Sequence, residues 1–179
     1  MSDANQPSAR SERTRNSLLD AAQELFVQQG YAATSMRQVA ENAGCALGSI
    51  YNHFPSKEAI FQAVLMERLP YPRFQHLLTP ANFDREHAKN LVNELDQQPE
   101  FFTLMLIELV EFKGEHLSEV FENILRDIPP PASWRNLLSM MISYHITRIL
   151  LANTMPSGAQ QISPDAFIDT FLNGILKPE

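Results

Sequence analysis

Polar side chains that suit hydrogen bonding are concentrated between residues 34 and 57 of this chain. Hydroxyl, phenol, amide, imidazole and cationic groups exchange hydrogen bonds with the phosphates and base edges of nucleic acids. Those between residues 47 and 53, with a leucine and a glycine among them, are Leu47, Gly48, Ser49, Tyr51, Asn52 and His53. We therefore expect recognition of a nucleic acid, rather than covalent chemistry, in this segment.

The rest of the chain offers little material for catalysis. The histidines lie at positions 53, 76, 87, 116 and 145, without the spacing of a metal-binding motif, and no glycine-rich phosphate loop occurs. We expect no catalytic residue, no metal and no cofactor. One alternative stays open, because Tyr144 and His145 would be able to transfer protons if they lined a small-molecule pocket. The single cysteine, Cys45, is interpreted as a packing residue rather than a redox sensor.

A short helix is predicted to begin after Ser35. Gln38 follows three residues later, which is the spacing of a capping box that satisfies unpaired backbone N–H groups. Val39, Ala40 and other small apolar residues then recur every three or four positions, as they do on the buried face of a helix. Gly44 is predicted to end this helix in a left-handed conformation, so that the chain reverses direction.

A second helix is predicted from residue 46 to residue 54. Ile50 and Phe54 are four positions apart and are expected to be buried, which leaves the candidate contact residues on the outer side. Pro55 cannot continue the helix, and Ser56 is a suitable cap for the next one. Two short helices joined by a glycine turn are typical of a helix-turn-helix unit, whose second helix enters the major groove of DNA.

This segment resembles the DNA-binding domain of the tetracycline-repressor (TetR) family of ligand-responsive transcriptional regulators. The resemblance rests on the Gly-Tyr pair at 30–31, the Gly-x-x-x-Gly spacing at 44–48 and the Tyr-x-x-Phe spacing at 51–54. It also includes an upstream apolar-faced segment that starts near Arg13, which resembles the first helix of the family. The alternative is an ordinary three-helix packing unit, or an adaptor that binds a protein and not DNA.

The resemblance implies that a set of residues between 34 and 57 contacts DNA, namely Thr34, Ser35, Arg37, Leu47, Gly48, Ser49, Tyr51, Asn52, His53 and Lys57. Tyr51, His53 and Lys57 would then bind phosphates, whereas Leu47 and Ser49 would meet base edges. For Tyr51 and His53, packing against the upstream helix is the alternative.

Two positions depart from the family pattern. Ala46 stands where the family usually has Ser or Thr, and the loss of such a cap costs about 1 kcal/mol of helix stability. Leu47 stands where a polar or basic residue is frequent. It is expected to replace a hydrogen bond by an apolar contact with a thymine methyl group.

The formal net charge of −7 is distributed unevenly along the chain. Most of the acidic residues lie in the C-terminal part, whereas Arg10, Arg13 and Arg15 can form a local basic surface with Arg37 and Lys57. No run approaches the ~20 apolar residues of a membrane-spanning helix, and the first residues are polar rather than those of a signal peptide. We expect a soluble, cytoplasmic protein with no membrane partner.

Prolines after residue 61 separate helical patterns, and no strand alternation of useful length occurs. The predicted fold is all-α. A three-helix helix-turn-helix DNA-binding domain is predicted at residues 1–55, ordered from about residue 10, and a helical effector-binding and dimerisation domain at residues 56–179. An acidic stripe in the second domain is interpreted as a solvated helix face. It consists of Glu108, Glu111, Glu115, Glu119 and Glu122.

The resemblance implies an effector pocket and a four-helix dimer interface in residues 56–179. Apolar bulk with methionines and a few polar tips suits a lipophilic ligand. The pocket candidates are Phe102, Met105, Leu106, Leu109, Phe112, Met141, Tyr144 and His145. The dimer candidates are Trp134, Leu138, Ile149, Phe167, Phe171, Leu172 and Ile175. A filled core without a cavity is the alternative for the first set, and a monomer core is the alternative for the second.

These observations predict a homodimeric, ligand-responsive transcriptional regulator that binds a palindromic operator in double-stranded DNA. The expected regulator is a repressor, which a small lipophilic effector releases from the operator by favouring a conformation that does not bind. One alternative is a constitutive DNA-binding regulator or activator without an inducer. The other is a small-molecule-processing enzyme on a helical scaffold.

Overall fold

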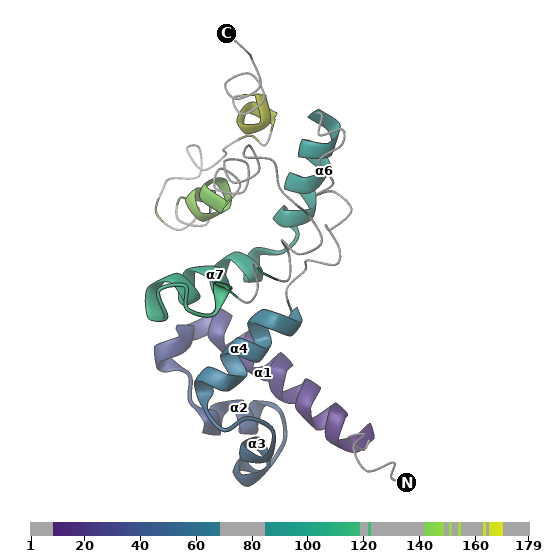
Figure 1. The fold of residues 1–179 in the computed structure, drawn as a ribbon, viewed down its shortest axis with the longest axis vertical. Helices are drawn as coiled ribbons and strands as arrows, with labels where there is room; N and C mark the ends of the chain where they lie inside the picture. Colours follow the sequence, from purple (N-terminus) through teal and green to yellow (C-terminus); the bar gives the residue numbers. More distant parts are fainter. Residues whose placement is uncertain are drawn as a thin grey trace. The chain divides into compact units, whose positions relative to one another are not determined.

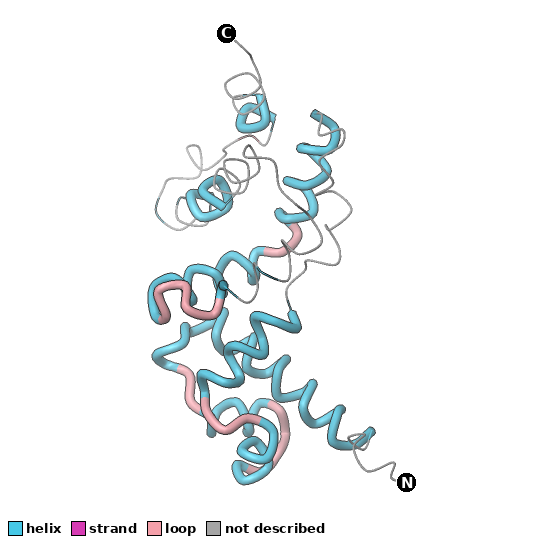
Figure 2. The backbone as a smooth tube through the Cα atoms, in the orientation of Figure 1, coloured by secondary structure: helices cyan, strands magenta, loops and turns pink. Residues whose placement is uncertain are grey.

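The computed structural model describes part of the chain (Figure 1). The described residues are 9–68, 85–118, 122, 142–148, 151, 154, 163 and 165–169. They lie in helices, turns and loops and include no strand, as Figure 2 shows, which confirms the predicted all-α class. The chain divides into two compact units. The first unit is Met1–Leu69 with Ile107–His116, and the second is Pro70–Leu106 with Leu117–Glu179.

The first unit opens with the long helix α1, Ala9–Ala33. Its buried side chains recur on one face, as expected for a helix that packs behind two others. They are Leu18, Leu19, Ala21, Ala22 and Phe26. At Gly30 the backbone leaves the helical region, with φ of 83° and ψ of 168°, and one further turn follows to Ala33. Gly30 therefore breaks α1, and a glycine suits this place because only glycine adopts this φ without strain.

Helices α2 (Met36–Asn42) and α3 (Leu47–His53) form the helix-turn-helix (Figure 1). The capping box at Ser35 is present, because its hydroxyl accepts a hydrogen bond from the Gln38 N–H and the Gln38 side chain accepts one from the Ser35 N–H. Gly44 in the turn has φ of 68°, as predicted. Ile50 and Phe54 are buried, so α3 turns its other side to solvent.

Helix α4, Lys57–Arg68, completes the three-helix packing against α1. The hydroxyl of Ser56 accepts a hydrogen bond from the Ala59 N–H at 3.0 Å, which confirms the predicted cap. Two ion pairs link the exposed sides of the helices: Arg15 bonds Glu67 at 2.6 Å, and Arg68 lies 2.8 Å from a carboxylate oxygen of Asp20.

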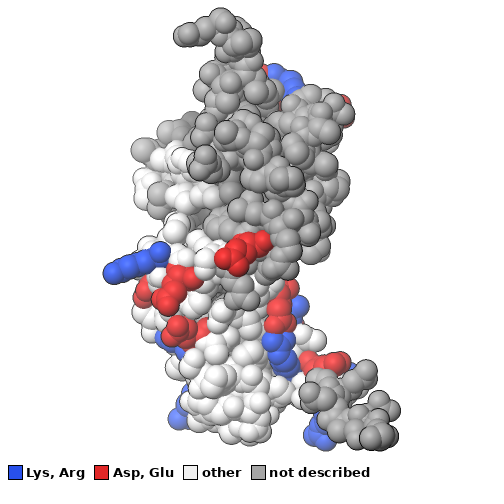
Figure 3. Space-filling model, in the orientation of Figure 1, with Lys and Arg blue, Asp and Glu red and all other residues white. Residues whose placement is uncertain are grey.

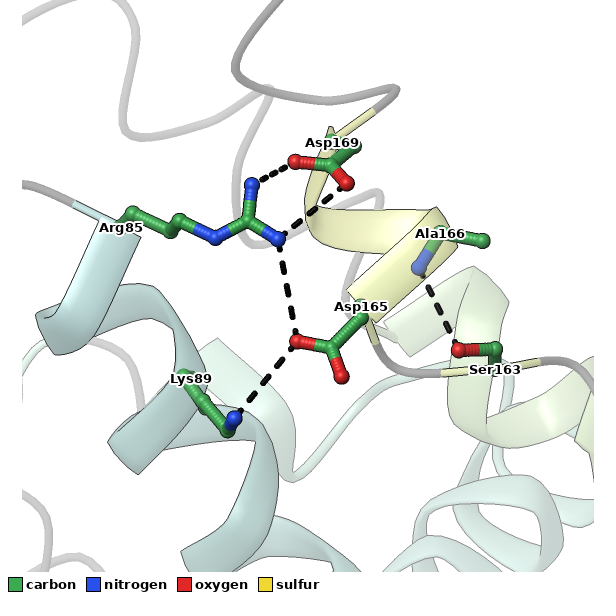
Figure 4. Close-up of polar contacts among 6 residues, drawn as sticks. All are labelled: Arg85, Lys89, Ser163, Asp165, Ala166 and Asp169. Atoms are coloured by element: carbon green, nitrogen blue, oxygen red, sulfur yellow. Dashed lines mark hydrogen bonds and ion pairs between the residues drawn. The ribbon is translucent and has the colours of Figure 1, made fainter.

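The second unit contains helix α6, Arg85–Asp96, and the first part of helix α7, Pro99–Glu111. The buried residues of α6 are Ala88, Leu91, Val92 and Leu95, which recur every three or four positions on one face of the helix. Figure 4 shows how the start of α6 is tied to residues 163–169 by ion pairs of Arg85 with Asp165 and Asp169, and of Lys89 with Asp165.

The boundaries of the compact units follow packing. Helix α4 belongs to the first unit together with residues 107–116, although the sequence assigns residues after 55 to the second domain. That domain was defined by effector binding and dimerisation, and its boundary stays a prediction. Helix α7 contributes residues to both units, because its first eight residues belong to the second and the rest to the first.

Candidate nucleic-acid interface and effector site

The outer face of α3 presents most of the predicted DNA contacts to solvent. Leu47 is 43% exposed and Tyr51 is 52% exposed, and Gly48 and Asn52 are exposed as well. Ile50 beneath them is completely buried against the other helices, so the core fixes which side of α3 faces outward. The arrangement gives one short helix a mixed apolar and polar face that is open to a groove of DNA.

Two other predicted contacts on α3 are less exposed. Ser49 and His53 are half-buried. The His53 ring lies 6.5 Å from the ring of Phe54, which is buried in the same unit. Both side chains remain on the same helix as the exposed candidates, and their contacts with DNA remain predictions.

Helix α2 adds two exposed candidates. Ser35 is the cap of the helix, and Arg37 forms an ion pair with Glu41 at 2.8 Å on its outer side. This pair is open to solvent, so it holds the guanidinium only weakly and a phosphate can compete for it. On the face in view, the surface over α2 and α3 is largely uncharged (Figure 3).

Thr34 does not lie with the exposed candidates. It is 2% exposed, and its hydroxyl donates a hydrogen bond to the carbonyl oxygen of Gly30 at 2.8 Å. The family resemblance implied that Thr34 contacts DNA. In the fold, the glycine break in α1 presents a carbonyl that binds the hydroxyl instead.

Lys57 is also bonded within the protein. Its ammonium donates hydrogen bonds to the carbonyl oxygens of Tyr31 at 2.7 Å and Thr34 at 2.8 Å, and it lies 4.1 Å from the centroid of the Tyr31 ring. Burial lowers the pKa of Lys57, and Glu111 opposes this shift. In the structure the amine joins the end of α1 to the start of α2, and the phosphate contact of Lys57 stays a prediction.

Arg15 was expected to be part of a local basic surface, and it is also bonded within the protein. The Arg15 guanidinium bonds the Glu67 carboxylate and lies 5.2 Å from the centroid of the Phe54 ring. The hydrogen bond from Arg15 holds the pKa of Glu67 below its usual value. Arg15 thus braces α1 against α4.

The second unit brings some of the pocket candidates together. Phe102 and His145 are buried, and their rings stack with centroids 4.1 Å apart and an interplanar angle of 17°. The Tyr144 ring meets His145 edge-on at 5.0 Å. Met105 is buried in the same unit, and Leu106 is half-buried. Aromatic rings and a methionine thus lie in the interior where an effector was predicted.

A charged network adjoins these rings. Nδ1 of His145 lies 3.2 Å from Oδ1 of Asp96, whose other carboxylate oxygen pairs with Arg148. Burial lowers the pKa of His145 to about 4, although the Asp96 charge opposes the shift. The imidazole is therefore neutral at pH 7. Within the described part of the chain, Nε2 of His145 is buried without a hydrogen-bond partner.

Two pocket candidates are placed elsewhere. Phe112 belongs to the first unit, where its ring packs 4.8 Å from Tyr31 and 5.1 Å from Phe61. Leu109 is 44% exposed and belongs to the same unit. The resemblance implied one pocket that both residues share with Phe102, but Phe102 belongs to the second unit and both of these residues to the first. Met141 lies outside the described residues.

The prediction of a solvated acidic stripe was wrong at Glu108. This side chain is completely buried in the first unit, and its carboxylate accepts hydrogen bonds from the N–H and Nδ1 of His116. Glu111, Glu115 and Glu122 are exposed, as expected for a solvated face. Glu119 lies outside the described residues.

Most dimer candidates lie outside the described residues. These are Trp134, Leu138, Ile149, Phe171, Leu172 and Ile175. Phe167 is half-buried, and its ring lies 4.6 Å from that of Tyr144 in the second unit. The interface stays a prediction.

Sequence reasoning did not find Asp96, Arg148 or His116. Each acts through a partner that is distant in the sequence or beyond a turn, and no local spacing marks such a pair. The one signal in the sequence was that these polar residues stand in or beside segments that are otherwise apolar.

Neither a metal site nor a membrane span is found where the structure is described. No cluster of His, Cys, Asp and Glu in the described ranges could hold a metal ion. Among the described helices, none has both the length and the hydropathy needed to cross a bilayer.

Comparisons with known proteins agree with the fold. Residues 18–64 match the family described as bacterial regulatory proteins, tetR family. Over 161 residues the chain is 27% identical to the HTH-type transcriptional repressor KstR2 of Mycolicibacterium smegmatis, which covers 80% of this chain and 76% of that protein. It is 42% identical to the HTH-type transcriptional regulator SrpR of Pseudomonas putida over 65 residues, 36% of this chain and 30% of that protein.

The likeness in structure extends over nearly the whole chain. The fatty acid degradation regulator FadR from Bacillus halodurans superposes with a TM-score of 0.63 and 15% identity, covering 97% of this chain and all of that one. At this identity, the likeness concerns the fold.

The fold and the exposed face of α3 define a helix-turn-helix, DNA-binding transcriptional regulator. Residues 18–64 of the chain are a DNA-binding domain of the TetR family of bacterial regulatory proteins. The relatives named above are regulators of transcription rather than enzymes.

Proposed function

We propose that this protein is a homodimeric repressor that binds a palindromic operator and leaves it when a small, largely apolar effector binds the second unit. The observation that carries DNA recognition is the outer face of α3, where Leu47, Tyr51 and Asn52 are exposed above the buried Ile50. The repressor KstR2 supports the direction of regulation by its name and by its likeness over most of this chain.

A dimer is proposed because one short recognition helix reads too few base pairs for specific binding. Two copies of α3 separated by ~34–36 Å enter successive major grooves on one face of the DNA. The operator is then a palindrome, since the two half-sites are related by the symmetry of the protein.

The interior of the second unit supports an effector site. The stacked rings of Phe102 and His145, with Met105 nearby in the sequence, offer apolar contacts and an adaptable side chain. The neutral His145 and the carboxylate of Asp96 add polar atoms that a donor group on the effector would satisfy. We propose that an effector displaces part of this packing.

Helix α7 offers a route from such a site to the DNA-binding unit. Phe102 near its start belongs to the second unit, whereas Phe112, just after its end, packs in the first unit against Phe61 of α4. A shift of α7 would therefore act on α4 and change the spacing of the two recognition helices. The effector must prefer the spacing that does not fit the operator.

The first experiment is selection of bound sites from a random DNA duplex pool by the purified full chain at physiological salt. We expect one palindrome from the wild type and none from Tyr51→Ala. Val110→Ala is the matched control, because Val110 is 75% exposed on α7 and lies outside the predicted contact set. Enrichment of no sequence, also after denaturation and refolding to remove a co-purified effector, would contradict the proposal.

The second experiment tests regulation. Binding of the selected operator is measured by fluorescence anisotropy in the presence of a panel of apolar acids, alcohols and drug-like amines. We expect at least one compound to weaken operator binding by about 10-fold or more, on the order of the coupling found in allosteric proteins. Tight, selective DNA binding that no compound changes would favour a constitutive regulator.

A further inference from the structure

We propose that Leu47 recognises thymine in each half of the operator through the C5-methyl group of the base. This inference rests on the proposed function, because it requires α3 in the major groove. It adds a specificity that the family membership does not supply, namely which base edge is read and by which chemical group.

The position of Leu47 suits contact with a base edge. Leu47 is the first residue of α3, and the first residues of a recognition helix are those that reach base edges in the major groove. Its side chain is 43% exposed, although leucine is among the residues that cores bury most often. Ile50 is the residue of α3 that the core buries completely, whereas Leu47 keeps much of its apolar surface in solvent.

The next residue allows α3 to approach the groove closely. Gly48 is exposed, and a Cβ atom placed there would meet no other atom within 4 Å. A side chain at this position would therefore not disturb the fold, yet it would project outward beside Leu47. Its absence lets the backbone of the first turn approach the DNA.

The other side chains of α3 leave few ways to read guanine. Within Leu47–His53 there is no Arg, Lys, Gln, Asp or Glu, and so no bidentate fork for guanine. On α2, we expect the exposed Arg37, which pairs only weakly with Glu41, to bind a phosphate rather than a base edge. Thymine is the one base with a methyl group in the major groove, and apolar side chains recognise it by contact. A leucine at this place in an uncharged helix therefore favours thymine.

Tyr51 is the competing apolar group on the same face. It is 52% exposed, but it lies one turn further along α3 and ends in a hydroxyl that suits a phosphate. A base that Tyr51 contacted would occupy a different position in the half-site. The test must therefore assign each methyl group to one side chain.

The experiment replaces each thymine of the selected operator by deoxyuridine, which pairs identically and lacks only the methyl group. Affinity of the full chain is measured by anisotropy for wild type, Leu47→Ala, Tyr51→Phe and Val110→Ala. At one thymine position, we expect replacement in a single half-site to weaken wild-type binding about 4-fold, because the burial of one methyl group is lost. Replacement in both half-sites should weaken binding about 15-fold.

Comparison of each variant on the thymine and deoxyuridine operators shows which side chain contacts the methyl group. Leu47→Ala should bind the thymine and deoxyuridine operators equally, whereas Tyr51→Phe and Val110→Ala should keep the full difference. At the same position, 5-methylcytosine should bind better than cytosine for the wild type and not for Leu47→Ala. Circular dichroism would check that the variants fold, which we expect because alanine favours helix and the leucine is exposed.

Other outcomes would overturn the inference. If no deoxyuridine replacement weakens binding, or if the penalty persists in Leu47→Ala, then Leu47 does not read a methyl group, although the proposed function stands. If the pool selection enriches no sequence, both the proposed function and this inference fail.

Discussion

The carboxylate of Glu108 is completely buried and accepts two hydrogen bonds from His116, one from the backbone N–H at 2.8 Å and one from Nδ1 at 2.9 Å. The two residues stand on either side of the turn that follows α7. On its other side, Nε2 of His116 lies 3.6 Å from a carboxylate oxygen of Glu58 on α4. This chain of contacts joins the end of α7 to the DNA-binding helices within the first unit.

Glu108→Ala is expected to destabilise the protein by about 3 kcal/mol, because it leaves His116 without its acceptor in a buried place and opens a cavity. Glu108→Gln keeps the volume and one carbonyl acceptor, so its loss should be smaller. Chemical denaturation of the full chain measures both. Glu111→Gln, one position in the exposed stripe, should change the free energy of unfolding by less than about 0.5 kcal/mol. Equal effects of Glu108→Ala and Glu111→Gln would contradict the role of the buried pair.

Lys57→Met and Arg37→Ala separate a positioning residue from a phosphate-binding one. Lys57→Met removes two hydrogen bonds to the carbonyl oxygens of Tyr31 and Thr34, and we expect weaker operator binding with an unchanged dependence on salt. Arg37→Ala removes an exposed cation, so the slope of log K against log salt should become shallower by about 0.9 for each phosphate that is no longer neutralised. Affinity measured at several salt concentrations checks both. A shallower slope in Lys57→Met would restore the phosphate-binding role that the sequence predicted.

Ala46→Ser is expected to stabilise the protein by about 1 kcal/mol. Ala46 already has the extended conformation of an N-cap, with φ of −68° and ψ of 144°, and no side chain caps α3. A serine hydroxyl would accept a hydrogen bond from one of the first N–H groups of the helix. Thermal or chemical unfolding measures the gain, and Ala32→Ser, at an exposed position inside α1, should give none. A loss of stability in Ala46→Ser would show that the turn depends on alanine for another reason.

The free energy of unfolding is expected to fall as the pH drops from 6.5 towards about 4, because His145 resists protonation in the folded state. Its pKa is lowered to about 4 by burial, whereas the unfolded chain takes up the proton near pH 6.5. Stability from this group is therefore complete above pH 6.5 and is lost at up to about 1.4 kcal/mol per pH unit below it.

Denaturation of wild type and His145→Phe across this pH range isolates the effect of His145. The phenylalanine keeps an aromatic ring beside Phe102 and does not titrate, so its stability should decline less steeply. Parallel curves for the two proteins would mean that the imidazole is hydrated enough to accept a proton in the folded state.

Local patterns in the sequence were sufficient for the helix-turn-helix. The capping box at Ser35, the turn at Gly44 and the burial of Ile50 all depend on residues within one or two turns of each other. Interactions of this range are encoded by spacing alone, so the all-α class and the outer face of α3 followed from the sequence. The missing cap at Ala46 was predicted for the same reason.

Tertiary structure decided what the long-range partners of each side chain are. Lys57 and Thr34 are the kind of residue that contacts DNA, but the break at Gly30 presents carbonyl oxygens that bind them inside the protein. Glu108 fits the periodicity of a solvated stripe and is buried all the same, because the last residues of α7 belong to the first unit and His116 donates hydrogen bonds to the Glu108 carboxylate. A sequence specifies which groups can bond, whereas only the packed chain determines which partner each group meets once water is excluded.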